Sequence, residues 1–502
     1  MNYYSLSAYE VALQEAGLLL GSTLRAEDRK VDISCLTYDT RTIEPTALFV
    51  CKGAHFKEDY LRQSLRDGAI AYVSEVTYAV DAPCLLVSDI RRAMVVLAQL
   101  FYERASEKVI SAGITGTKGK STVTYYLRAI LDDWLLAQGK KKCAVLSSID
   151  VYDGVEDEES HITTPEVLEL HRHFRNACDS GISHLVMEVS SQALKYGRVR
   201  DIAYDVACFT NIGTDHISPI EHPDFEDYYT SKLRIFDACS VGCVNTDADY
   251  AERTLRYAKE RCPVLTFGSH ETDDFTVSDI KKEPDGIYFT VKSNVYQGRF
   301  SITMPGLFNV SNAMAALTMA SVLGVPEEFV RSGLRRARAA GRMQVYESAD
   351  RRVAVIVDYA HNRMSFDALY RSTRLEYPGY EMISVFGCPG KKALLRRKDL
   401  GELSGQNCAF VYITEEDSGE EPFASIAADI EKHVSCPHLC LEDRGECIRR
   451  AIFDHSDKHV VLLTGKGEET RMKRGLAYVD YPSDVEWTLK YLAEYDKKKA
   501  QQ

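Results

Sequence analysis

The feature that most constrains this chain is a glycine-rich segment, residues 113–121, set between an apolar stretch and a helix-forming stretch. It reads Gly-Ile-Thr-Gly-Thr-Lys-Gly-Lys-Ser, after an expected strand at 109–112 and before an expected helix at 121–136. Such glycines allow a tight turn whose N–H groups face phosphate oxygens, while a lysine adds a point charge and a serine hydroxyl can bind Mg²⁺. The segment therefore predicts a phosphate-binding loop in an α/β domain. A dinucleotide-binding fold is disfavoured, because no G-x-G-x-x-G sequence follows an expected strand.

Alternation of apolar runs with turn residues divides the 502 residues into three α/β units. We expect further strands at 184–187, 205–209, 353–357, 382–386, 408–414 and 460–464, and a helix at 309–323. The predicted fold is a small N-terminal α/β domain over 1–108, a central parallel-sheet domain of the P-loop ATPase type over 109–340, and a C-terminal Rossmann-like α/β domain over 341–502.

Charge and composition exclude several classes of function. The formal net charge of −13 repels polyanions, so nucleic acid is not an expected partner. The longest apolar runs, such as 93–102 and 313–325, are shorter than the roughly 18 to 20 residues that span a bilayer. The 14 cysteines are scattered, and the first residues lack the basic start of a signal peptide. We expect a cytoplasmic monomer with small-molecule partners, no nucleic acid and no membrane.

Further motifs follow one another in order along the chain. They are Tyr38-Asp39-Thr40-Arg41 with Leu48-Phe49-Val50, Thr163-Thr164-Pro165-Glu166, the run from Glu188 to Leu194 followed by Arg198, Phe209-Thr210-Asn211 with Asp215-His216, Lys232, Asn309 and Asn312, Gly341-Arg342-Met343, and Asp358-Tyr359-Ala360-His361. Together with G-T-x-G-K-S in the phosphate loop, this series resembles the Mur ligases, the amino-acid-adding enzymes of peptidoglycan precursor synthesis, and among them the tripeptide synthetase branch. The resemblance covers nearly the whole chain.

The resemblance implies a role for each matching residue. ATP would be bound by Gly116, Thr117, Lys118, Gly119, Lys120, Ser121, Thr122, Asn309, Arg342, Asp358 and Tyr359. The UDP-substrate, whose uridine would lie on the N-terminal domain, would be bound by Thr40, Arg41, Thr163, Thr164, Ser190 and Arg198. The catalytic residues would be Lys120, Glu188, His216 and Lys232. Magnesium would be held by Ser121, Glu188, His216 and Lys232.

Two of these residues have alternative readings. An ammonium at Lys232 would repel the metal that it accompanies, so the resemblance implies that this lysine is carboxylated on its side-chain nitrogen by CO2. The alternative is an unmodified surface lysine paired with Asp227 or Asp237. For His216, the alternative to a metal ligand is a helix-capping or core histidine.

The third domain departs from the family pattern around the incoming amino acid. G-C-G-G-D-R-D, D-N-P-R and G-K-G-H-E are replaced by the sequences at 387–393, 416–419 and 465–469. The resemblance assigns amino-acid binding to Lys392, Asp417, Gly419, Gly465 and Glu469. A basic group, residues 391–398, is expected to screen the anionic substrates.

The implied activity is an ATP-dependent amide ligase that adds the third amino acid to UDP-MurNAc-L-Ala-D-Glu through an acyl phosphate. Relatives that add meso-diaminopimelate place an arginine against its distal carboxylate, and Gly419 stands at that position here. Acidic residues from Glu415 to Glu421 would attract an ammonium, which favours L-lysine. The alternatives are the same step with meso-diaminopimelate or another amino acid, a folylpolyglutamate or cyanophycin type of ligase, and an inactive nucleotide-binding paralogue.

Overall fold

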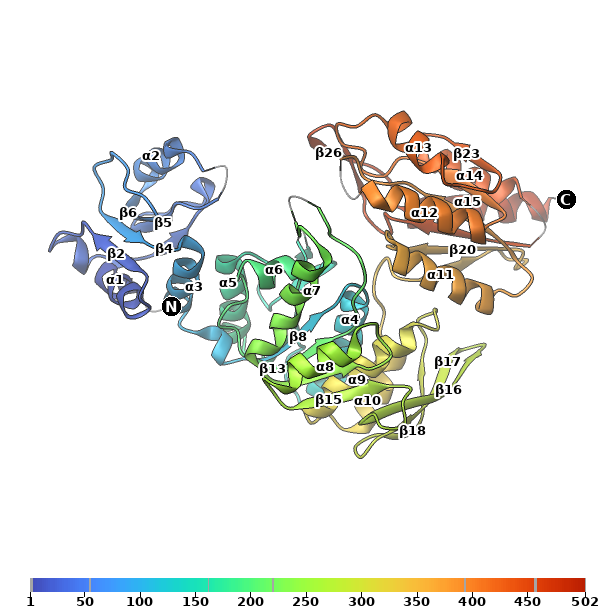
Figure 1. Ribbon diagram of the computed structural model, residues 1–502, viewed down its shortest axis with the longest axis horizontal. Coiled ribbons are helices and arrows are strands. Elements are labelled where there is room, and N and C mark those ends of the chain that lie inside the picture. Colours follow the sequence, from blue (N-terminus) through green and yellow to red (C-terminus); the bar gives the residue numbers. More distant parts are fainter. Residues whose placement is uncertain are drawn as a thin grey trace.

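The computed structural model describes residues 3–53, 56–160, 162–218, 221–391, 394–455 and 458–501. Figure 1 shows three bodies side by side along the long axis, in chain order from the N-terminal end to the C-terminal end. Each body has its own main sheet with helices packed on it, and no strand is shared between these sheets. In the described part of the chain, no helix is both long enough and apolar enough to cross a bilayer. We propose 1–108, 109–340 and 341–502 as the limits of three domains.

The N-terminal body is a five-stranded sheet with three helices. Its elements are β1 (Tyr4–Ser5), α1 (Leu6–Glu15), β2 (Leu19–Ser22), β3 (Asp32–Ile33), β4 (Cys35–Thr37), β5 (Ala47–Val50), α2 (Glu58–Asp67), β6 (Ala69–Ser74), β7 (Cys84–Val87) and α3 (Ile90–Phe101). The order is β2-β7-β6-β5-β4, and all pairs but β2 with β7 are parallel. Buried Val167 and Leu168, from the central body, join its core.

The central body holds an eleven-stranded sheet. Its elements are β8 (Ile110–Thr115), α4 (Lys120–Ala137), β9 (Ala144–Leu146), β10 (Asp150–Tyr152), β11 (Asp157–Glu159), α5 (Val167–Asp179), β12 (His184–Glu188), α6 (Ser191–Lys195), β13 (Tyr204–Phe209), α7 (Phe225–Leu233), β14 (Cys239–Asn245), α8 (Ala251–Lys259), β15 (Val264–Gly268), β16 (Phe275–Glu283), β17 (Gly286–Lys292), β18 (Gln297–Ile302), α9 (Asn309–Val322) and α10 (Glu327–Arg336). The order is β11-β10-β9-β12-β8-β13-β14-β15-β16-β17-β18.

The predicted parallel central sheet is confirmed for its middle strands, and the sheet adds antiparallel strands at both ends. The strands from β9 to β16 pair in parallel, but β10 and β11 on one side and β17 and β18 on the other are antiparallel. These outer strands follow one another through short connections, which only antiparallel neighbours permit. The phosphate-loop strand β8 nevertheless lies in the parallel part, between β12 and β13.

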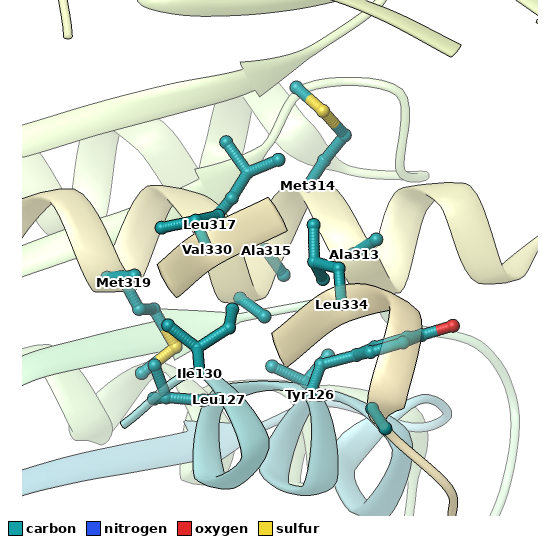
Figure 2. Packing of buried hydrophobic residues seen from close by; sticks show 14 of the residues in the cluster. Tyr126, Leu127, Ile130, Ala313, Met314, Ala315, Leu317, Met319, Val330 and Leu334 are labelled. Carbon is teal, nitrogen blue, oxygen red and sulfur yellow. The ribbon is translucent and has the colours of Figure 1, made fainter. Parts of the chain in front are cut away.

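Helix α4 begins directly after the phosphate loop, and packing in an apolar core fixes its position. Tyr126 and Ile130 of α4 pack with Leu317 of α9 and with Val330 and Leu334 of α10, and all five are fully buried. Figure 2 shows these side chains interdigitating between the three helices. Burial of such side chains contributes about 1.5–3 kcal/mol each, so the helix start has little freedom to move.

The C-terminal body is a six-stranded sheet covered by helices. Its elements are β19 (Gln344–Glu347), β20 (Val353–Asp358), α11 (Arg363–Glu376), β21 (Glu381–Phe386), α12 (Leu394–Asn407), β22 (Phe410–Ile413), α13 (Phe423–Glu431), β23 (His438–Cys440), α14 (Arg444–Phe453), β24 (His459–Thr464), β25 (Arg471–Arg474), β26 (Ala477–Asp480) and α15 (Asp484–Ala500). The order is β19-β20-β24-β21-β22-β23, with only β19 antiparallel. Parallel pairing brings the loops after β20, β21, β22 and β24 to one edge.

The expected strands and helices are confirmed, since each overlaps an element of the same type.

A buried ion pair holds the edge that carries the C-terminal loops. Arg444 donates to both carboxylate oxygens of Asp484 at 2.7 Å and to the carbonyl of Thr464, the last residue of β24, at 2.8 Å. Both side chains of the pair are 1% exposed. The pair therefore ties α14, α15 and the end of β24 together.

Asp484→Asn should lower the free energy of unfolding of the C-terminal domain by about 3–5 kcal/mol, because it leaves a buried guanidinium without its counter-charge. Asp367→Asn is the matched control, since Asp367 pairs with Arg371 on the surface. The control should change this free energy by less than about 0.5 kcal/mol. Urea unfolding followed by circular dichroism measures both, and equal effects would contradict the role given to the buried pair.

Candidate active site

The phosphate loop contains two glycines with positive φ, and one of them, Gly116, lies against the residues that follow β13. Gly116 and Gly119 have φ values of +147° and +86°, which side chains other than hydrogen disfavour. A Cβ on Gly116 would lie 2.0 Å from Thr210 Oγ1. Asn211 accepts from the Lys118 N–H at 2.9 Å, and Thr210 donates to the Lys118 carbonyl at 2.7 Å. The loop conformation is therefore set by β13 as well as by its own sequence.

Two lysines and a serine of the loop supply polar groups at the start of α4. Lys120 Nζ donates to the carbonyls of Gly116 at 3.1 Å and Thr117 at 3.4 Å. Burial lowers the pKa of Lys120, and it lowers the pKa of Lys118 to about 7. The Ser121 hydroxyl lies 3.2 Å from that of Ser148. Thr122, on the first turn of α4, is also buried.

Glu188 and Lys232 are buried beside this loop. Glu188, the last residue of β12, accepts hydrogen bonds at Oε1 from Ser148 N at 2.9 Å and Ser148 Oγ at 3.1 Å. Lys232 Nζ donates to the carbonyl of Gly116 at 2.8 Å and lies 4.8 Å from the centre of the Tyr228 ring. Burial, with Lys120 nearby, holds the pKa of Lys232 well below its usual value.

The alternative of Lys232 as a surface lysine is wrong. Its side chain is 2% exposed, and the two carboxylates proposed as its partners bind other cations. Asp227 pairs with Lys195 at 2.6 Å, and Asp237 pairs with Arg261 at 2.8 Å. Among the described residues, Lys232 forms no ion pair. A buried lysine with a lowered pKa and no carboxylate partner has more of its amine in the neutral, nucleophilic form.

His216 neither caps a helix nor lies in the core. Its backbone is left-handed, with φ of +57°, and its side chain is 41% exposed. The ring nitrogen Nδ1 lies 2.8 Å from Glu221 Oε1. That contact orients the ring, so the nitrogen Nε2 is the one that remains for a ligand.

The third domain reaches the loop through several of the predicted ATP residues. Arg342 donates to the Ser121 hydroxyl at 3.3 Å and lies 4.9 Å from the centre of the Tyr359 ring. Asp358 accepts from Met343 N at 2.9 Å, and burial raises its pKa. Asn309, at the start of α9, is buried and binds Asn312, which lies against Gly119. The structure thus brings residues of two domains to one loop.

Asp215 is a second link between these domains. Its carboxylate is 3% exposed and lies 2.9 Å from Arg396 and 3.7 Å from Lys118 Nζ. Asn362 donates to it as well, and His361 lies 3.1 Å from Lys118. Burial alone would raise the pKa of Asp215, but Lys118 and Arg396 hold it well below its usual range.

The residues predicted to bind the UDP-substrate divide into two groups. Buried Thr164 donates to the carbonyl of Glu188 at 2.9 Å and accepts from Ser190 N at 3.0 Å. Arg198 binds Glu166 at 2.7 Å, and Lys52 of the N-terminal body binds the other oxygen of Glu166 at 2.6 Å. These contacts place this group beside Glu188.

The second group lies apart from it. Thr40 and Arg41 lie on a short exposed turn, where Arg41 binds Asp39 at 2.6 Å and is 86% exposed. No contact in the described structure joins these two residues to Thr164 or Arg198. Thr163 is half-buried.

The acidic residues from Glu415 to Glu421 in the third domain are mostly paired with cations, although the sequence alone suggests an uncompensated negative charge. Four of the five residues in this acidic run bind cations: Glu415 binds Arg474, Asp417 binds Lys466, Glu420 binds Lys391 and Glu421 binds Arg397. Glu416 is the exception, because its carboxylate has no ion pair or hydrogen bond with any described residue. It is 8% exposed, and burial raises its pKa to about 7.

Gly465 and Glu469 lie in the loop after β24, close to this acidic run. A Cβ on Gly465 would lie 2.1 Å from Glu416 Oε2, so the Glu416 carboxylate lies directly against the loop. Glu469 accepts from Tyr359 at 2.6 Å and from Lys466 at 2.6 Å. Gly419 has φ of +57° and donates its N–H to the carbonyl of Lys473, which joins it to β25.

The described members of the basic group are paired with carboxylates, and the expectation that the group screens the substrates stays a prediction. Arg396 is bound to Asp215, and Arg397 to Glu421 and Asp429. Lys391 and Lys398 bind Glu420 and Glu402 on the surface. Lys392 lies outside the described residues.

Sequence reasoning did not identify several residues that shape the site. Asp215 and Glu166 lie within recognised motifs, but some of their partners, Arg396 and Lys52, come from other domains. Lys466 lies in the G-K-G motif and is buried, and Glu469 and Asp417 hold its pKa above the usual value although burial would lower it. Ser148 lies in none of the recognised motifs. No sequence signal could have paired it with Glu188.

Comparisons with known proteins agree with this arrangement. The Mur ligase middle domain matches residues 114–320, and the domain described as Mur ligase, glutamate ligase domain matches residues 341–467. The UDP-N-acetylmuramoyl-L-alanyl-D-glutamate--L-lysine ligase of Enterococcus faecalis is 35% identical, with 88% of each chain covered. The UDP-N-acetylmuramyl-tripeptide synthetase of Lactobacillus delbrueckii subsp. bulgaricus is 33% identical, covering 98% of this chain and 99% of the relative.

Solved structures share the fold at lower identity. A UDP-N-acetylmuramoyl-L-alanyl-D-glutamate--2,6-diaminopimelate ligase has a TM-score of 0.64 and 22% identity, covering 94% of this chain and 97% of the other. The MurF ligase of Thermotoga maritima in complex with ADP has a TM-score of 0.61 and 20% identity, covering 93% and 98%. The two family matches, and relatives above 30% identity over most of both chains, establish that this chain belongs to the Mur ligase family.

Proposed function

We propose that this protein is an ATP-dependent ligase that joins L-lysine to UDP-MurNAc-L-Ala-D-Glu, as a monomer in the cytoplasm. The observation that carries the proposal is the meeting of Lys118, Lys120 and Ser121 with buried Glu188 and Lys232 at one edge of the central sheet, under Arg342 of the third domain. The curated relatives, named as ligases of this step, support the same reaction.

The proposed chemistry uses ATP to make a carboxylate reactive. A carboxylate oxygen of the UDP-substrate bonds to the γ-phosphorus as the bond to ADP breaks, which gives an acyl phosphate. The amine of the amino acid then bonds to the acyl carbon, phosphate leaves with the carboxylate oxygen, and the amine loses a proton. Negative charge builds up in both steps, so Lys120, Lys118 and Arg342 act by position and charge.

The residues around the loop also fit magnesium. Ser121 and Glu188 offer oxygen donors, and Glu188 Oε2 has no partner among the described residues, while His216 offers a ring nitrogen. Magnesium bound here would neutralise charge on the phosphates. Lys232 fits only if its nitrogen carries a carboxylate, because an ammonium would repel the metal.

Carboxylation of Lys232 agrees with its surroundings. A lysine reacts with CO2 as the free amine, and the lowered pKa of Lys232 keeps that form available. Its side chain is buried and free of ion pairs to described residues, so no carboxylate competes for it. The modified side chain would carry one negative charge beside Lys120 and Lys118.

The choice of L-lysine rests on Glu416. This carboxylate is the one member of the acidic run that forms no ion pair with a described cation, and it lies against Gly465 at the edge where the third-domain loops meet. An ammonium arriving there would gain a counter-charge, whereas a second carboxylate would be repelled. Gly419 provides no side chain that could bind a distal carboxylate.

The alternatives have weaker support. A folylpolyglutamate type of ligase shares the fold, as a Mycobacterium tuberculosis synthase with a TM-score of 0.60 shows, but that match covers 74% of this chain. An inactive paralogue would not need Lys120, Glu188 and Lys232 at one loop. The match to a 2,6-diaminopimelate ligase, at 22% identity, supports the fold alone.

The purified protein, given ATP, Mg²⁺ and UDP-MurNAc-L-Ala-D-Glu, should release ADP with a higher kcat/KM for L-lysine than for meso-diaminopimelate or other amino acids. Burial raises the pKa of the Glu416 carboxyl to about 7, so its ionised fraction rises as the pH passes through neutrality. The KM for L-lysine should therefore fall as the pH rises from about 6 to 8. Glu416→Gln should raise this KM about tenfold and remove the pH effect.

Glu420→Gln is the control, because Glu420 is a surface residue paired with Lys391. It should leave the KM for L-lysine unchanged. Faster reaction with meso-diaminopimelate would show that the charge argument chose the wrong acceptor, and no ADP release with any amino acid would favour the inactive paralogue.

Lys232→Ala should lose nearly all turnover, and short carboxylates such as acetate or formate should restore part of it by occupying the place of the carbamate. Mass spectrometry of the intact wild-type protein in bicarbonate, with Lys195→Ala as a control lysine variant, tests the modification separately. Full activity of Lys232→Ala, or loss without any rescue and without added mass on the wild type, would contradict the proposed carbamate.

A further inference from the structure

Asp215 is a buried carboxylate. Its own domain supplies only some of the cations and hydrogen-bond donors that offset the loss of its hydration. It lies in the loop after β13, and its side chain is 3% exposed. From the central domain, Lys118 Nζ lies 3.7 Å away and the N–H of His216 donates at 3.0 Å. The imidazole of His216 lies 3.9 Å away. A buried carboxylate needs closer hydrogen-bonded partners than these to offset its lost hydration.

The remaining partners come from the C-terminal domain. Arg396, on the first turn of α12, donates to Asp215 Oδ1 at 2.9 Å. Asn362, the residue that caps α11, donates to the other oxygen and is 2% exposed. His361 lies 4.0 Å from Asp215 and 3.1 Å from Lys118. Two helix starts of one domain thus converge on one carboxylate of the other.

We propose that Asp215 is an interdomain latch, a positioning residue that holds the C-terminal domain over the phosphate loop through Arg396 and Asn362. Separation of the domains would leave Arg396 without this carboxylate and Asp215 without two donors. The attraction is therefore realised only when the domains are together, where burial strengthens it.

The latch reaches the phosphate loop through Lys118. The ammonium of Lys118 lies between Asp215 and His361, so the contact that closes the domains also fixes a cation of the loop. Arg342 contacts Ser121 in the same closed arrangement. In its effect on turnover, this inference rests on the proposed function: opening the latch should lower kcat more than it changes the KM for ATP.

The test measures domain closure without requiring catalysis. Small-angle scattering should give a larger radius of gyration for Asp215→Ala and for Arg396→Ala than for the wild type, and Arg396→Lys should recover part of the difference. The double variant should be no larger than either single variant, because both remove the same contact. Lys398→Ala, on the same helix but paired with Glu402 of its own domain, should match the wild type.

Turnover is the second readout. Each single variant should lose about tenfold in kcat, with the double variant losing no more, while thermal unfolding by circular dichroism stays at the wild-type temperature. Unchanged radii in both single variants, or losses that multiply in the double variant, would overturn the latch. Absence of turnover in the wild type would count against the proposed ligase and would leave the scattering comparison to decide the latch. If Asp215→Ala does not fold, Arg396→Ala gives the same comparison from the other domain.

Discussion

The close approach of the phosphate loop to the end of β13 is the constraint on which the site depends. Gly116 leaves room for Thr210, and the amide of Asn211 binds the backbone of Lys118. Because any side chain at Gly116 would collide with β13, the loop can take this path only with glycine there. The path turns the carbonyls of Gly116 and Thr117 toward Lys120, and the carbonyl of Gly116 also receives Lys232.

Around this fixed loop, the polar groups come from elements that are far apart along the chain. Glu188 comes from β12 and Lys232 from α7 of the central body, and Arg342 comes from the start of the C-terminal body. Apolar packing of α4 against α9 and α10 fixes the helix that follows the loop, whereas the third domain contacts the loop through polar side chains. A site with one rigid side and one polar side that can separate from it suits a reaction in which substrates must enter and water must then be excluded.

The sequence predicted the three α/β units and the loop because these depend on local order: an apolar strand, a glycine turn and a helix in succession. It did not predict the antiparallel ends of the central sheet, where consecutive strands are joined without a helix between them. The charge of this segment along the chain was also a poor guide, since Glu415 and Asp417 pair with Arg474 and Lys466, which lie 59 and 49 residues further along. Glu416 differs from them through its burial, which only the folded chain shows.

The central claim is that this site transfers a phosphoryl group from ATP to the carboxylate of the UDP-substrate before the amide forms. Isotope transfer tests it most directly. UDP-MurNAc-L-Ala-D-Glu labelled with ¹⁸O in the reacting carboxylate, with ATP and L-lysine, should yield phosphate that carries one ¹⁸O atom, seen by ³¹P NMR or mass spectrometry. Phosphate without ¹⁸O, released together with the amide product, would contradict the acyl phosphate and with it the proposed use of the loop.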